Sequence, residues 1–265
     1  MRVASCTVLT FALLAAGCGG GGSEEPEAAS PGPATVTVEV TVAAPPQASP
    51  RCEPVAHEPL VAAATAYAAS ARRPVAVHRH PGGAVVERFG RLNPNGVTTV
   101  FGVLGRRVGE DCRASWYRVR LPRRPNGRVG WVRAADVAIA EVGTRIVVDL
   151  SDRRVTLFRG RRAVLSAPAA IGSPATPTPT GTYYVDQRLL APDPSGPFGP
   201  GAVGIAAYSE VLTGWTQGGP IAIHGTNRPD LIGQAVSNGC IRVRNDVLRR
   251  LFTVTPEGTP VEIQS

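Results

Sequence analysis

A cysteine and a histidine in the last third of the chain have the residue types and the spacing for chemistry. Cys240 lies in the run Ser237-Asn238-Gly239-Cys240-Ile241-Arg242, and His224 precedes it by 240 − 224 = 16 positions. A free thiol is mostly protonated at neutral pH, so it needs a nearby base to become a nucleophile. From Glu141 to the C-terminus these are the one cysteine and the one histidine. The pair indicates acyl transfer, with Cys240 as nucleophile and His224 as general base.

Each of the two residues also has a more common role. A lone cysteine is most often a small buried hydrophobe, and a lone histidine most often has a structural role. Zinc needs three or four ligands, and Asp230 and Asp246 would serve only in an unusual site. We therefore expect neither a metal nor a cofactor.

The surrounding motifs resemble the L,D-transpeptidase catalytic domain. That family reads His-Gly, a variable stretch, and then Ser-His-Gly-Cys-Val/Ile-Arg, against His224-Gly225 and the run from Ser237 to Arg242 here. Asn238 is a departure, because many members have histidine there. Three further segments are similar to the segment before the family's catalytic half and to its last turn and strand: 171–174, 178–183 and 256–263. The resemblance spans residues 144–264.

The resemblance implies a mechanism on peptidoglycan stem peptides. Cys240 would attack the carbonyl at the L-to-D junction between the third and fourth stem residues, and the Gly225 carbonyl would orient His224. Backbone amides of Gly239 and Cys240 would hold the oxyanion. An amine acceptor would give a cross-link by L,D-transpeptidation, and water would make the enzyme an L,D-carboxypeptidase.

Three neighbours of the nucleophile are assigned to substrate binding: Ser237, Asn238 and Arg242. For Arg242 two roles stay open, because a planar guanidinium suits either a substrate carboxylate or a brace for the Cys240 loop. Ser237 is open in the same way. Core packing is the expected role of Tyr208.

Charge is unevenly distributed along the 265 residues, which suffice for two modest domains. Residues 51–140 carry 15 Arg and 6 acidic groups, a net charge of +9, and residues 141–265 carry 12 Arg and 10 acidic groups, a net charge of +2. A basic middle segment suits anionic lipid or anionic wall polymers. Nucleic acid is disfavoured because the N-terminus resembles an export signal.

The N-terminus predicts export and lipid anchoring. Met1-Arg2 precedes an apolar run from Val3 to Ala16, which is too short to span a membrane. Leu14-Ala15-Ala16-Gly17-Cys18 then resembles a lipobox, whose cysteine becomes diacylated. We expect a lipoprotein at the outer face of the cytoplasmic membrane, with a signal peptide cleaved without lipidation as the alternative.

The other cysteines fit an exported protein. Cys6 would leave with the signal peptide, and Cys240 must stay a free thiol. Cys52 and Cys112 remain, and an oxidising compartment permits a disulfide between them.

The pattern along the chain predicts a mainly β protein in four parts. Residues 1–17 would be the signal peptide, and residues 18–52, rich in Gly, Pro, Ala and Glu, a flexible tether. Residues 53–140 show short alternating runs and a Trp-Tyr…Gly-Trp-Val ending that resembles bacterial SH3-like β-barrels. Residues 141–265 would form the transpeptidase-type β-sandwich, with a short helix beginning near Asn245, the expected helix cap. Residues 60–71 fit a helix or a strand, and the proline-rich residues 191–201 would be a loop at the active cleft.

Residue order and motifs argue against other functions. Sortase-like transpeptidases also use His, Cys and Arg, but their Thr-Leu-x-Thr-Cys pattern is missing and Arg242 follows Cys240 too closely. Papain-like wall endopeptidases place cysteine before histidine. A non-catalytic wall-binding lipoprotein with a decayed site is disfavoured by the intact Cys240 and His224.

Overall fold

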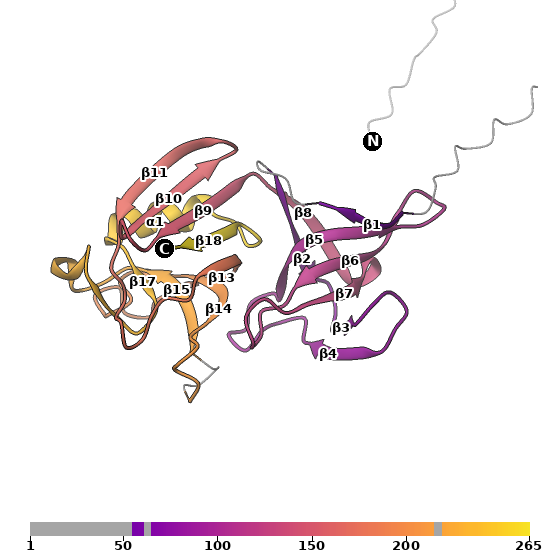
Figure 1. The fold of residues 1–265 in the computed structure, drawn as a ribbon, viewed down its shortest axis with the longest axis horizontal. Coiled ribbons are helices and arrows are strands. Elements are labelled where there is room, and N and C mark those ends of the chain that lie inside the picture. Colours follow the sequence, from indigo (N-terminus) through magenta and orange to yellow (C-terminus); the bar gives the residue numbers. More distant parts are fainter. Residues whose placement is uncertain (1–54, 61–64, 215–218) are drawn as a thin grey trace, which may run out of the picture. The chain divides into compact units, whose positions relative to one another are not determined.

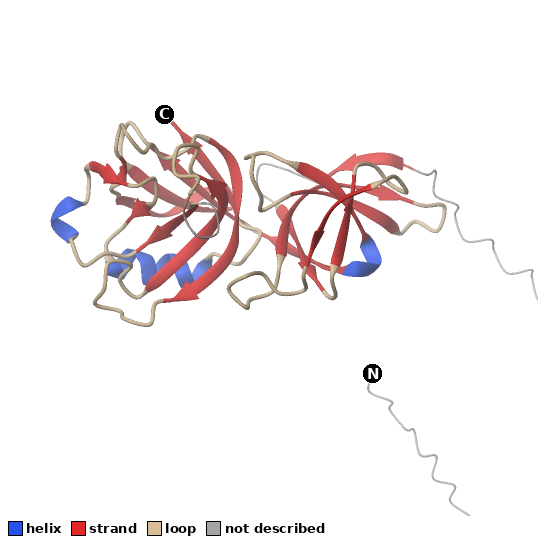
Figure 2. Cartoon of the chain, turned by 90° about the horizontal axis from the view of Figure 1, so that it is seen from below, coloured by secondary structure: helices blue, strands red, loops and turns tan. Residues whose placement is uncertain are grey.

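The computed structural model describes residues 55–60, 65–214 and 219–265, all within one compact unit from Ser49 to Ser265. Strands dominate these residues, which confirms the predicted mainly β fold (Figures 1 and 2). The signal peptide, Cys18, the tether and Cys52 lie outside the described residues, so the expectations for them stay predictions. No helix of the described part has the length and apolar composition needed to cross a bilayer.

The first sheet, coloured indigo to magenta in Figure 1, has the strand order β4-β3-β7-β6-β5-β2-β8, with β1 paired to β5. Its strands are β1 (Val55–Pro59), β2 (Ala66–Ala71), β3 (Val75–His78), β4 (Val85–Phe89), β5 (Val100–Val108), β6 (Ala114–Arg120), β7 (Val129–Arg133) and β8 (Val137–Val142), with a 3₁₀ turn at Ala134–Asp136. The ambiguous stretch 60–71 therefore ends in a strand.

Alternating apolar residues build the core of this sheet. Val75, Val77, Phe101, Val119 and Val132 are almost completely buried in one cluster, as expected for strands with one face inward. The resemblance of this region to SH3-like barrels stays a prediction.

The second sheet has the order β11-β10-β9-β18-β13-β14-β15-β17, and β12 and β16 form a small parallel pair. Its strands are β9 (Thr144–Asp149), β10 (Arg154–Arg159), β11 (Arg162–Pro168), β13 (Gly181–Leu190), β14 (Gly201–Tyr208), β15 (Pro220–His224), β17 (Ile241–Arg242) and β18 (Pro260–Gln264); the small pair is β12 (Ile171–Gly172) and β16 (Ala235–Ser237). The chain passes from the first sheet to the second between Val142 and Thr144.

Strand β13 divides its pairing between two neighbours. Residues 181–184 pair with β18, and residues from Val185 to Leu190 pair with β14. The register with β14 shifts between Val185 and Gln187, so a bulge falls at Asp186. Bulges redirect a side chain and often occur beside functional sites.

Helix α1 (Asn245–Val254) is the one α-helix of the described part, shown in blue in Figure 2. Its Leu248 and Leu251 are buried in the core of the second sheet. The predicted cap was wrong: Arg244 is the N-cap, without a side-chain hydrogen bond, and Asn245 is the first helical residue. The Asn245 side chain instead accepts a hydrogen bond from the Thr226 N–H.

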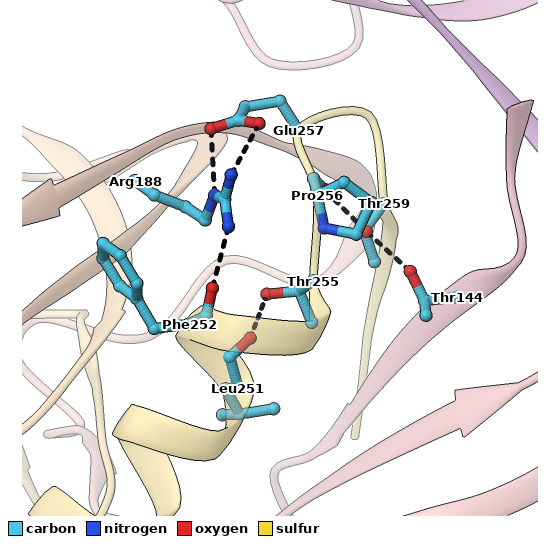
Figure 3. A network of polar contacts seen from close by, with 8 residues as sticks. All are labelled: Thr144, Arg188, Leu251, Phe252, Thr255, Pro256, Glu257 and Thr259. Carbon is cyan, nitrogen blue, oxygen red and sulfur yellow. Dashed lines mark hydrogen bonds and ion pairs between the residues drawn. The ribbon is translucent and has the colours of Figure 1, made fainter. Parts of the chain in front are cut away.

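A polar network fixes the C-terminal end of α1 (Figure 3). The Arg188 guanidinium of β13 donates to Glu257, with Nε–Oε1 at 3.0 Å, and to the Phe252 carbonyl at 2.8 Å. The hydroxyl of Thr255 donates to the Leu251 carbonyl at 2.6 Å. These contacts tie β13, next to its bulge, to the helix.

Candidate active site

Two parallel strands bring the sequence-predicted residues together. In the pairing of β15 with β17, Ile223 lies opposite Ile241 and His224 opposite Arg242. His224 thus ends β15, and Cys240 directly precedes β17. Both line one cavity of about 90 Å³. The parallel pairing of β15 and β17 therefore brings together two residues that are sixteen positions (240 − 224) apart in the sequence.

The imidazole of His224 is held in one tautomer. Its Nδ1 lies 2.6 Å from the Gly225 carbonyl oxygen, the contact expected from the sequence. A carbonyl only accepts, so Nδ1 carries the hydrogen and Nε2 keeps a free lone pair. Burial lowers the His224 pKa to about 4, against the opposing effect of that carbonyl, and the Arg242 charge lowers it further. The side chain is therefore a neutral base at physiological pH.

An aromatic ring covers this imidazole. Phe198 belongs to the predicted loop at 191–201, and its ring centroid lies 4.8 Å from that of His224. Phe198 also lines the cavity, which agrees with the expectation that this loop borders the active cleft. Excluding water from the ring contributes to the burial that keeps His224 neutral.

The Cys240 thiol is also neutral at rest. Burial raises its pKa above the ordinary value, and the Arg242 charge offsets only part of that effect. Sγ donates a weak hydrogen bond to the Pro220 carbonyl at 3.9 Å. A neutral thiol beside a neutral imidazole means that the proton must move during attack, not before it.

Ser237 organises the nucleophile loop. Its Oγ donates to the Cys240 carbonyl at 2.5 Å and accepts the Gly239 N–H at 3.1 Å. The Gly239 amide is therefore engaged inside the loop, which corrects its assignment to the oxyanion hole and leaves the Cys240 amide. Gly239 has φ 106°, a region that favours glycine, so its requirement is conformational. Ser237 is 1% exposed, and the contacts favour a positioning role over substrate contact.

Two threonines that sequence reasoning did not single out clamp the same loop. Thr176 Oγ1 donates to the Ser237 carbonyl at 2.9 Å, and Thr178 Oγ1 donates to the Gly239 carbonyl at 2.9 Å. Thr178 Oγ1 also accepts the Gly172 N–H at 2.9 Å. In the sequence, only the similarity of this segment to the family pointed to a role at the site. In the structure, its threonine hydroxyls hold the Cys240 loop.

Asn245 was missed as a site residue. Its Oδ1 accepts the Thr226 N–H at 2.8 Å, one residue after the carbonyl that orients His224. A Cβ added at Gly225 would lie 2.3 Å from that oxygen. The helix start thus holds the backbone of the His224 turn, and only glycine fits at Gly225 without a shift.

Arg242 and Asn238 both line the cavity of Cys240 and His224. The Arg242 Nε is buried and has no hydrogen-bond partner. Within the described residues its side chain forms no ion pair that would brace the loop. A buried Nε–H without a partner favours a ligand carboxylate over the bracing role.

Two cysteines, Cys112 and Cys240, lie in the described part of the chain. Cys240 is a free thiol, and Cys112 is disulfide-bonded. The Cys52–Cys112 pairing stays a prediction because Cys52 is not described. Among the described residues no cluster of three or more His, Cys, Asp or Glu side chains is placed to hold a metal ion.

Several known proteins resemble part of this chain. A family model of the L,D-transpeptidase catalytic domain matches residues 143–263. A protein of Bacillus licheniformis named as the L,D-transpeptidase YkuD is 40% identical over 119 residues, covering 45% of this chain and 64% of that protein. Its namesake in Bacillus subtilis is 39% identical over 118 residues, covering 44% and 64%. The chain thus matches less than two thirds of the length of these relatives. A solved L,D-transpeptidase from Mycobacterium smegmatis is 19% identical with a TM-score of 0.39, over 63% of this chain and 91% of that one.

Proposed function

We propose that this chain, whose residues 143–263 are an L,D-transpeptidase catalytic domain, cross-links peptidoglycan by acyl transfer through a thioester on Cys240. One observation carries the proposal. A free thiol shares a cavity with a neutral imidazole whose Nδ1 proton is fixed on the Gly225 carbonyl. That tautomer leaves Nε2 as the acceptor for the thiol proton.

The first half-reaction transfers the donor stem to the enzyme. Sγ of Cys240 attacks the carbonyl carbon at the L-to-D junction while Nε2 of His224 takes the thiol proton. The new C–S bond forms, the C–N bond breaks, and the proton passes from His224 to the departing amine. The Cys240 N–H stabilises the oxyanion; loss of one such donor typically costs about 3 kcal/mol of barrier.

The second half-reaction returns the thiol. An amine of a neighbouring stem attacks the thioester carbonyl, a C–N bond forms and the C–S bond breaks. One amine proton passes through His224 to the Cys240 sulfur. With water in place of the amine, the same steps hydrolyse the thioester, which is the carboxypeptidase alternative.

Arg242 binds a carboxylate of the donor stem in this scheme. Its buried, unpartnered Nε supports the assignment. Arg242→Gln is expected to raise KM for the donor by about tenfold or more, because a charge-assisted hydrogen bond is lost. An unchanged KM would return Arg242 to the bracing role.

The decisive experiment is intact-mass analysis with a disaccharide-tetrapeptide. We expect a thioester adduct on wild-type protein, a cross-linked product when an amine is present, and no adduct on Cys240→Ala. Acylation by a carbapenem-type β-lactam gives a second test of the same thiol. A chain that forms neither adduct is not a cysteine acyltransferase, and the wall-binding alternative would then stand.

We also propose a location for this protein in the cell envelope. The lipobox-like run ending at Cys18 supports a lipid anchor at the outer face of the cytoplasmic membrane. A diacylated cysteine carries two acyl chains, and two chains anchor a protein far better than one. The net charge of +9 over residues 51–140, from 15 Arg and 6 acidic groups, supports contact of the first sheet with anionic wall polymers. Release of wild-type protein into the medium with an unmodified N-terminus would refute the anchor.

A further inference from the structure

A second cavity, of about 350 Å³, is lined by residues of both eight-stranded sheets. The second sheet contributes Asp186 and Gln187 of β13, Tyr208 of β14 and Pro220 of β15. The first sheet contributes Arg88 of β4, and Arg123 from the loop after β6. Its volume falls in the range of small-molecule sites.

Hydrogen bonds between the two sheets hold the walls of this cavity. Asn93 and Asn95 each donate from Nδ2 to the Gln187 Oε1 at 2.9 Å. Asn126 and Tyr208 exchange two bonds, because Asn126 Nδ2 donates to the Tyr208 carbonyl and the Tyr208 N–H donates to Asn126 Oδ1, both at 2.9 Å. The cavity is therefore preformed.

One wall carries a buried carboxylate oxygen without a partner. Asp186 sits at the β13 bulge, and its Oδ1 is shielded from solvent and accepts no hydrogen bond. Burial raises the pKa of this carboxyl to about 7. A carboxylate in such a place is costly unless a donor reaches it. An ammonium group in the cavity would supply the opposite charge to this carboxylate.

The other wall carries the complementary charge. Arg88 has no ion pair and no side-chain hydrogen bond among the described residues. Arg123 uses its Nε on Glu87 at 2.8 Å, and Arg128 lies 2.9 Å from the same carboxylate. Arg123 and Arg128 thus share one acid, and Arg88 remains available for a carboxylate. Opposed charges on two walls suit a ligand with an ammonium and a carboxylate.

The cavity adjoins the active site through Pro220. This residue lines both cavities, and its carbonyl accepts the hydrogen bond from the Cys240 thiol. It also begins β15, the strand that ends at His224. The two cavities therefore share one lining residue.

We propose that this second cavity binds a zwitterionic amino-acid group of the acceptor stem, with Asp186 holding the ammonium and Arg88 the carboxylate. The identification of the ligand as a stem rests on the proposed function. The recognition of an amino-acid zwitterion rests on the cavity alone. An ammonium held by Asp186 has no lone pair, so it must lose its proton and leave Asp186 before its nitrogen can attack the thioester. The cavity would therefore hold the acceptor stem before the second half-reaction, and it does not by itself decide between amine attack and hydrolysis.

Calorimetric titration with three probes tests the proposal at pH 7.5. Nε-acetyl-lysine carries the free zwitterion, Nα,Nε-diacetyl-lysine lacks the ammonium, and Nε-acetyl-lysinamide lacks the carboxylate. We expect the first to bind and each blocked probe to bind about tenfold to a hundredfold more weakly, the loss typical of a hydrogen bond to a charged group. Equal binding of the three probes, or no binding of the first, overturns the proposal.

Variants locate the site. Asp186→Asn and Arg88→Gln are each expected to weaken Nε-acetyl-lysine by about tenfold or more. Asp152→Asn, an exposed carboxylate in the turn before β10, is the matched control and should bind like wild type. Thermal unfolding checks that Asp186→Asn folds, and the exposed Arg88 gives a second variant if it does not. Wild-type affinity in Arg88→Gln overturns the carboxylate half of the site, and wild-type affinity in a folded Asp186→Asn overturns the ammonium half.

Acylation of wild-type protein by the β-lactam separates this proposal from the function it extends. Acylation without probe binding refutes the acceptor cavity alone. Probe binding without acylation refutes the transferase and leaves an amino-acid site.

Discussion

Replacing Phe198 with alanine should make the acylation of Cys240 sensitive to mild acid. The Phe198 ring lies 4.8 Å from the His224 imidazole, and burial is the largest cause of the lowered His224 pKa, about 4. Removing the ring admits water, which favours the charged imidazolium and raises the pKa toward the ordinary value of about 6.5. Only the neutral imidazole accepts the thiol proton, so the acid limb of the acylation rate follows this pKa.

The magnitude follows from the two limiting pKa values. With a pKa of about 4, about 90% of His224 is neutral at pH 5, and the rate changes little between pH 5 and 7.5. With the ordinary pKa of about 6.5, about 3% would be neutral at pH 5, and the rate would fall roughly thirtyfold over the same interval. Full release corresponds to about 3.4 kcal/mol at about 1.4 kcal/mol per pKa unit. We expect Phe198→Ala to move the midpoint of the acid limb upward by about one unit or more.

The assay is stopped-flow acylation by a carbapenem-type β-lactam from pH 3.5 to 8 at constant ionic strength, with circular dichroism at each pH to confirm folding. Phe158→Ala is the control, since Phe158 packs with Arg145 in the second sheet. A wild-type acid limb with its midpoint above pH 6 would refute the neutral resting pair. An unshifted limb in Phe198→Ala would remove the ring as a cause of the low pKa.

Three further outcomes are expected. Thr178→Val removes the hydroxyl between the Gly172 N–H and the Gly239 carbonyl. The loss should lower the unfolding free energy, measured by urea titration, by about 1–3 kcal/mol, and it should slow acylation. An unchanged acylation rate would mean that Thr178 does not position the Cys240 loop. Asp186 has a folded pKa of about 7, above the ordinary 3.8, so its favourable contribution is complete below pH 3.8 and lost as the pH rises through 7. Asp186→Asn should therefore raise the unfolding free energy by up to about 4 kcal/mol at pH 8 and change it little at pH 3, and an equal gain at both pH values would contradict the buried charge. Mild reduction of the Cys112 disulfide should leave β-lactam acylation unchanged, since Cys240 is free; peptide mapping that pairs Cys240 with another cysteine would overturn this.

Local patterns in the sequence predicted most of the strands. Val75 and Val77 alternate with more polar neighbours and lie buried in β3, and Asn126-Gly127, a typical hairpin turn sequence, joins β6 to β7. The alternation of apolar and polar residues indicates which face of a strand is buried, and it can be seen within a few neighbouring residues of the sequence. The alanine-rich stretch before Ala71 carries no such contrast, so only its pairing with β5 and β8 decides that it is a strand.

The proximity of Cys240 and His224, the proposed catalytic pair, could be predicted from residue types, but the residues that support them could not. Thr178, Asn245 and the Gly239 backbone act through contacts made across long separations, such as the bond from Thr178 to the Gly239 carbonyl. Threonine in a proline-rich segment has no sequence feature that marks it as a clamp. The Gly239 amide could not be excluded from the oxyanion hole without the position of Ser237.

The roles of Tyr208 and Asp186 also could not be predicted from the sequence. Tyr208 reads as a core residue, yet it lines the second cavity and exchanges hydrogen bonds with Asn126 of the other sheet. Asp186 reads as an ordinary strand carboxylate, and only the register shift between β13 and β14 isolates its Oδ1. Sites built between two sheets depend on register, which a single sequence does not show.

Burial is the common cause of the resting state at the two cavities. It lowers the pKa of His224, raises that of Cys240 and raises that of Asp186, and in each case the neutral form is favoured. A neutral thiol and imidazole hold no ion pair that substrate binding must disrupt, so charge develops only as the thiol attacks. Arg242 disfavours the imidazolium, but it stabilises the thiolate that forms when Cys240 loses its proton. The arrangement therefore makes the thiol less reactive in water and favours its reaction with a bound carbonyl, which suits the proposed thioester mechanism.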